Sequence, residues 1–123
     1  MTGFAGKVIA ITGASEGIGA ELARQFSGKA VWLALAARNL EKLERTAAEC
    51  RALGAEAIAI RCDVSVEADC RNFIEETARK YSSLDILVNN AGVSGHAWFE
   101  EVTDFAWYEA MMRVNYIDRK SVV

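Results

Sequence analysis

The first stretch whose residue types and spacing could do chemistry is Thr12–Gly19, where three glycines follow the pattern Gly-x-x-x-Gly-x-Gly. An apolar, β-branched run over residues 7–11 precedes it, as expected of a buried parallel strand. Ile18, Leu22 and Phe26 follow at helical spacing, so the glycines lie where a strand turns into a helix. Unpaired amides and the positive end of a helix dipole point outward there, which favours binding of a dinucleotide pyrophosphate.

Each glycine has its own expected role. Gly13 permits the tight turn, Gly17 omits the Cβ that would hold the backbone away from a phosphate, and Gly19 lets the helix pack close to the strand. Turns without a ligand also use glycine, and it is the strand before and the helix after that favour the nucleotide site. No Lys-Ser or Lys-Thr pair follows the glycines, which excludes a P-loop.

The end of the second expected strand, residues 31–36, bears on cofactor choice. An acid about 20 residues past the glycines would hold the ribose 2′-hydroxyl and favour NAD. Ala37 stands at that position and Arg38 follows it. Because a guanidinium can bind a 2′-phosphate through two parallel hydrogen bonds, this pair favours NADP over NAD. The alternative is an exposed arginine that merely ends the strand.

Two further strands end in polar residues. Asp63-Val64 closes the expected strand at 56–62, and Asn89-Asn90-Ala91-Gly92 closes the expected strand at 84–88. Carboxyl ends of parallel strands form the edge at which open α/β sheets bind ligands. For Asp63, a loop-capping Asx turn is an equal alternative.

The two glycine-containing motifs, at about this separation, resemble the short-chain dehydrogenase/reductase family from about Lys7 to Ile117. The resemblance implies that Asp63 accepts a hydrogen bond from the adenine amino group, that Val64 packs on the ring and that Asn115 supports a proton relay. NADP-preferring members often carry Lys or Arg where this chain has Glu16. The cofactor-binding residues implied are Gly13, Ser15, Gly17, Ile18, Gly19, Arg38, Asp63, Val64, Asn89, Ala91 and Gly92.

Enzymes of this family use a Ser and a Tyr-x-x-x-Lys, in which the lysine lowers the pKa of the tyrosine that acts as general acid and base. Tyr116 and Lys120 match that spacing but directly follow Asn115, whereas the family places its tyrosine some forty residues later. We interpret this match as accidental. His96 is interpreted as a surface residue of the loop after Gly92.

Periodicity predicts helices at about 17–26, from Asn39 to Gly54, from a Ser65 cap to Tyr81, and from a Thr103 cap to about Tyr116. Strands alternating with helices indicate an α/β fold, a doubly wound, Rossmann-like parallel sheet. Right-handed crossovers give the strand order 3-2-1-4, so the fourth strand is expected at an edge of this partial sheet, exposed to intermolecular pairing.

The totals bound the protein class. A chain of 123 residues with 52% hydrophobic content can bury one core, and a net charge of −3 gives no reason to expect nucleic acid or an anionic membrane as partner. Cys50, Cys62 and Cys70 form no Cys-x-x-Cys pair and no targeting leader is visible, so we expect reduced thiols, no metal site and a cytoplasmic protein.

Residues 118–123 match the translation of a common sequencing adapter, so we expect residues 1–117 to be the incomplete NADP-binding domain of a longer protein, followed by a non-native tail. The parent would be an NADP(H)-dependent oxidoreductase acting on a small-molecule carbonyl or alcohol, and a homo-oligomer when full length. The chain itself would lack the catalytic Ser and Tyr-x-x-x-Lys. The alternative is a non-catalytic NAD(P)-binding sensor, which would lack them in the parent as well.

Overall fold

The computed structural model describes residues 4–90 and the backbone of residues 121 and 122. Strands and helices alternate through the first seven elements, and a two-residue strand closes the series. The elements are β1 (Val8–Thr12), α1 (Gly17–Ser27), β2 (Trp32–Ala37), α2 (Leu40–Ala52), β3 (Glu56–Arg61), α3 (Glu67–Tyr81), β4 (Ile86–Val88) and β5 (Ser121–Val122).

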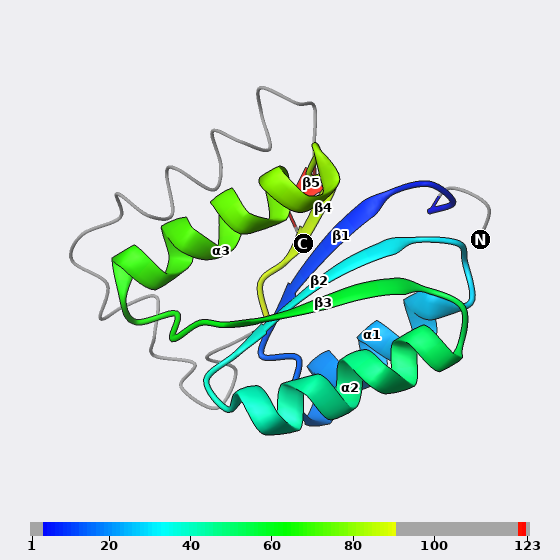
Figure 1. Ribbon diagram of the computed structural model, residues 1–123, viewed down its shortest axis with the longest axis horizontal. Coiled ribbons are helices and arrows are strands. Elements are labelled where there is room, and N and C mark those ends of the chain that lie inside the picture. The colour runs from blue at the N-terminus through cyan, green and yellow to red at the C-terminus, as the bar shows by residue number, and fades with distance from the viewer. Residues whose placement is uncertain (1–3, 91–120, 123) are drawn as a thin grey trace.

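All strand pairs are parallel, and the sheet order is β3-β2-β1-β4-β5. The predicted α/β class and the 3-2-1-4 order are therefore confirmed. In Figure 1 the helices α1 and α2 cover one face of the sheet, and α3 covers the other. Because β1 lies between β2 and β4, the turn that follows it is flanked by the carboxyl ends of two neighbouring strands.

The expectation that β4 forms the edge of the sheet is wrong. Ser121 pairs with Ile86 and Val122 with Leu87, so β5 covers two of the three β4 residues. The physical reason is that an open strand edge binds any backbone segment that can complete its hydrogen bonds. Residues 121 and 122 belong to the segment 118–123 that was predicted to be a non-native tail.

Each face of the sheet packs against its own apolar core. The core under α1 and α2 includes Ile9, Leu33 and Leu43, while the core under α3 includes Phe73 and Leu87. Every residue of β1 is buried, as its uninterrupted apolar run predicts for a central parallel strand. The sheet thus has a helix-covered apolar core on each of its two faces.

The buried face of α1 differs from the predicted one. Gly19, Ala20 and Ala23 are buried, whereas Ile18 is 64% exposed. Small side chains let the helix axis approach the sheet, so the large residues at positions 22 and 26 reach only the margin of the core. The large apolar residues at helical spacing therefore lie along the side of the buried face of α1 and not at its centre. Ile18, in the first turn, is exposed.

The helix starts test the predicted caps. Asn39 caps α2 as predicted, because its Oδ1 accepts from the Lys42 amide at 3.0 Å. Ser65 is not the cap of α3, since Val66 holds that position and no side chain bonds there. Instead Ser65 donates from its amide and its hydroxyl to Asp63 Oδ1, at 2.9 and 2.6 Å. The helix expected at 103–116 lies outside the described residues.

Candidate functional site

The turn between β1 and α1 has the backbone geometry that its glycines predict. Gly13 and Gly17 have φ values of +65° and +63°, which side chains other than glycine rarely adopt. A Cβ on Gly19 would overlap the carbonyl oxygen of Gly13 and come within 2.7 Å of Asn90 Nδ2. Glu16 is the N-cap of α1 but makes no side-chain cap bond, so the first amides of this helix remain available to an anion.

Two asparagines after β4 brace this turn. Asn90 Nδ2 donates to the Gly13 carbonyl oxygen at 3.3 Å, and Thr12 Oγ1 donates to Asn89 Oδ1 at 3.3 Å. Both bonds join residues 77 positions apart. The two sequence motifs therefore meet at the carboxyl edge of the sheet. Asn90 bears directly on the shape of the turn, although it was not among the residues predicted to bind the cofactor.

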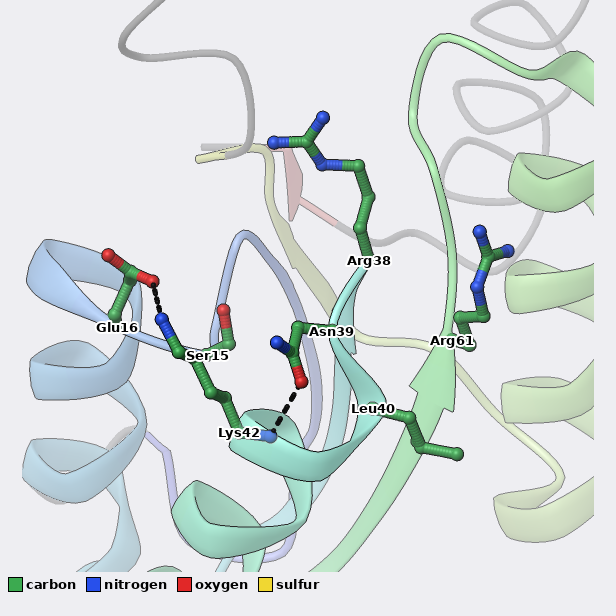
Figure 2. Close-up of a pocket in the computed structure, with 7 residues that line it drawn as sticks. All are labelled: Ser15, Glu16, Arg38, Asn39, Leu40, Lys42 and Arg61. Atoms are coloured by element: carbon green, nitrogen blue, oxygen red, sulfur yellow. Dashed lines mark hydrogen bonds and ion pairs between the residues drawn. The ribbon is translucent and has the colours of Figure 1, made fainter.

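A surface pocket of about 730 Å³ opens beside the turn, between the first residues of α1 and α2. Figure 2 shows Arg38 and Arg61 projecting from the ends of β2 and β3, and Lys42 reaching from α2 toward Glu16. Three cations and one carboxylate line the pocket, which therefore suits an anionic ligand. The lining residues are Ser15, Glu16, Arg38, Asn39, Leu40, Lys42 and Arg61.

Sequence reasoning identified Arg38 and Ser15 but missed Lys42 and Arg61 at this pocket. Lys42 lies in the first turn of α2, which Asn39 caps, and the predicted start of that helix just after Arg38 was the available signal. Its Nζ forms an ion pair with Glu16 Oε1 at 3.2 Å. Among the described residues, no hydrogen bond or ion pair holds the Arg38 guanidinium, which is exposed.

Asp63 forms the Asx turn that was the alternative to adenine binding. Hydrogen bonds from the side chain and then the backbone of Ser65 hold the pKa of the Asp63 carboxyl below its usual range, and the charges of Arg38 and Arg61 act in the same direction. Val64 beside it is partly buried against the α3-side core. A role of either residue in adenine binding stays a prediction.

Several predicted residues lie outside the described ones. These are Ala91 and Gly92 of the second motif, His96, Asn115, and the Tyr116 and Lys120 match. Within residues 4–90, no group of three or more His, Cys, Asp or Glu side chains could hold a metal ion. The three cysteines are free and buried. In that same part of the chain, no helix is both long and apolar enough to cross a membrane.

A family model described as short chain dehydrogenase matches residues 7–118. The chain is 42% identical over 113 residues to 11-beta-hydroxysteroid dehydrogenase A of Sesamum indicum, covering 91% of this chain and 32% of that protein. It is 43% identical over 111 residues to 11-beta-hydroxysteroid dehydrogenase-like 3 of Arabidopsis thaliana, covering 89% and 36%. The chain thus spans about a third of the length of these curated relatives.

Solved structures share the fold. A xylitol dehydrogenase solved with NAD+ bound superposes with a TM-score of 0.85 at 26% identity, covering 97% of this chain and 52% of that one. A hydroxysteroid dehydrogenase from Escherichia coli superposes with a TM-score of 0.70 at 35% identity, covering 72% and 36%.

Proposed function

The chain belongs to the short chain dehydrogenase family, and on that premise we propose that it is the NADP(H)-binding part of an oxidoreductase. The reaction is a hydride transfer between the nicotinamide and a carbonyl or alcohol carbon of a small molecule. Residues 1–117 form the cofactor domain in this proposal, and 118–123 are a non-native tail. The parent enzyme is cytoplasmic and assembles as a homo-oligomer.

The observation that carries the cofactor choice is Arg38 at the carboxyl end of β2. Its guanidinium lines the pocket of about 730 Å³, next to the glycine turn. Ala37 before it is 7% exposed and offers no carboxylate to a ribose 2′-hydroxyl. A 2′-phosphate can therefore meet a cation here without competition from an acid at that position. Glu16 is the one carboxylate among the described lining residues.

In this proposal the remaining described residues each bind a different part of the cofactor. The pyrophosphate meets the amides at the start of α1, including those of Ile18 and Gly19, and Ser15 lines the ribose-phosphate side. Asp63 and Val64 lie at the end of β3 for the adenine. Asn89 accepts a hydrogen bond from Thr12 after the end of β4 and so braces the sheet edge beside the cofactor.

The chemistry proposed for the parent needs groups beyond these. The bound cofactor supplies the hydride, while Asn115 supports the relay that restores a proton to the active-site lysine. A serine and a Tyr-x-x-x-Lys later in the parent polarise the substrate oxygen and transfer its proton. If the parent lacked that tyrosine and lysine, it would bind the cofactor without turnover, as a sensor.

The experiment is to reverse the preference of the parent protein for NADPH over NADH by mutation. Wild type should bind NADPH more tightly than NADH, and Ala37→Asp with Arg38→Asp should reverse the order. Loss of the charge-assisted contact should cost about 1.5–3 kcal/mol for NADPH. Fluorescence titration with both cofactors measures the two dissociation constants.

Arg71→Gln is the matched control, because Arg71 is an arginine of α3 that pairs with Glu67 and does not line the pocket. It should leave both affinities unchanged. Equal affinity of the wild type for NADPH and NADH would contradict the proposed cofactor preference.

A further inference from the structure

The ion pair between Lys42 and Glu16 borders two pockets. Its atoms lie 3.2 Å apart and join the N-cap of α1 to the first turn of α2. Ser15, Glu16 and Lys42 line both the pocket of about 730 Å³ and a neighbouring one of about 320 Å³. Figure 2 shows the Lys42 side chain directed toward Glu16, while Arg38 extends from the end of β2 away from that pair.

The pair is held weakly compared with its neighbour. The Lys42 and Glu16 side chains are 49% and 72% exposed, and exposed ion pairs contribute little net stability. In the smaller pocket, by contrast, Arg24 is bound to two carboxylates, those of Glu21 and Glu49. A phosphate entering this region can therefore recruit Lys42 more readily than Arg24.

The backbone of Lys42 is held in place, while the end of its side chain can change partners. Its backbone amide is fixed by Asn39 Oδ1 at 3.0 Å, so the base of the side chain stays at the mouth of the pocket. The four-carbon stem leaves the ammonium, with its three donors, free to turn between two acceptors. A doubly charged phosphate is a stronger hydrogen-bond acceptor than one carboxylate, because it carries more negative charge and has more acceptor oxygens.

We propose that Lys42 is a second ligand of the 2′-phosphate, beside Arg38, and that Glu16 is its displaceable counterion. The inference rests on the proposed NADP(H) function. In the free protein, Glu16 holds Lys42, and the entering phosphate takes the lysine over. Glu16 thereby lowers the affinity for ligands that carry a 2′-phosphate, because it holds Lys42, and it leaves the affinity for ligands without that group unchanged.

The test uses the 123-residue chain and two probes that differ in one group, adenosine 2′,5′-bisphosphate and adenosine 5′-monophosphate. Saturation-transfer NMR titrations give the dissociation constants. Lys42→Met should weaken the bisphosphate about ten-fold, the loss expected of one charge-assisted contact, without changing the monophosphate. Glu16→Gln should tighten the bisphosphate by about three-fold. Lys7→Met, at the opposite end of β1, is the matched control and should change neither.

The double variant separates exchange from simple repulsion. If Glu16 acts through Lys42, then Lys42→Met should weaken the bisphosphate more in the Glu16→Gln background than in the wild type. Additive effects would show that Glu16 acts on the phosphate through space, and an unchanged affinity in Lys42→Met would overturn the inference outright. Neither of these results touches the proposed function, which fails instead if the wild-type chain binds both probes equally.

Discussion

At the scale of single residues, Gly19 decides how closely α1 approaches the turn after β1. The Gly13 carbonyl oxygen lies 2.1 Å from the position that a Cβ on Gly19 would take, and the Asn90 side-chain amide donates to that same oxygen. Both contacts are made within the protein alone. The shape of the turn is therefore set before any cofactor binds, which lowers the ordering cost of binding.

Gly19→Ala should destabilise the chain by about 1–3 kcal/mol, because the added methyl group meets backbone that must move. Gly28→Ala is the matched control, since a Cβ at Gly28 meets nothing within 4 Å and its φ is −81°. That variant should stay within about 0.5 kcal/mol of wild type. Urea denaturation followed by circular dichroism measures both, and equal stability of the two variants would contradict the close approach.

Residues whose role is local could be predicted from the sequence. The glycine turn, the Asn39 cap and the place of Arg38 at the pocket each depend on a few neighbours in the chain, and motif spacing carries that information. The Lys42–Glu16 pair joins residues 26 positions apart, so no local pattern predicts it. Ser65 was wrongly predicted to cap α3. A serine can either cap a helix or donate to a nearby carboxylate, and here its hydroxyl donates to Asp63.

At the scale of elements, a tyrosine ties the end of α3 to the sheet. Tyr81 Oη donates to the Leu33 carbonyl oxygen of β2 at 3.2 Å, across 48 positions of sequence. Burial, followed by the charge of Glu56, raises the pKa of Tyr81 from its ordinary 10.0 to about 12. The folded protein therefore favours the neutral phenol.

This shift sets the sign of a pH effect on stability. Below about pH 10 the tyrosine is protonated in both states, and wild type should exceed Tyr81→Phe in unfolding free energy by about 1 kcal/mol through the hydrogen bond. Between pH 10.0 and about 12 the unfolded chain loses the proton first, so this advantage should shrink as the pH rises. Urea denaturation across that range measures it. A difference between the two proteins that does not change with pH would contradict the burial of the phenol.

The order and type of the elements can be predicted from the periodicity of hydrophobic residues, but the buried face of α1 cannot. Large apolar side chains define the period, whereas the small residues Gly19 and Ala23 define the contact with the sheet. The fourth strand begins at Ile86 rather than Leu84, because Asp85 pairs with Val8 through both its amide and its carboxylate. The first residue of a strand depends on its pairing with the neighbouring strand, and the sequence of the strand itself does not show that pairing.

At the scale of the whole molecule, the sheet order brings together the residues of the candidate site. The strand ends that carry Thr12, Arg38 and Asn89 are neighbours only because β1 pairs with both β2 and β4. The βαβ crossover rules predict this order from the sequence. They do not predict which backbone covers the outer edge of β4, since β5 pairs there from residues 121 and 122, which lie beyond the residues that the family model matches.

The central claim is that NADP binds along the carboxyl edge of this sheet with its 2′-phosphate at Arg38. Titration of NADP+ into the ¹⁵N-labelled chain, followed by amide chemical shifts, tests it most directly. The account predicts shifts concentrated at residues 15–19, at Arg38 and Lys42, and at Asp63 and Val64, with smaller changes at Arg38 and Lys42 when NAD+ is used. Unchanged spectra, or shifts confined to the amino edge near residues 5–7 and 54–56, would contradict it.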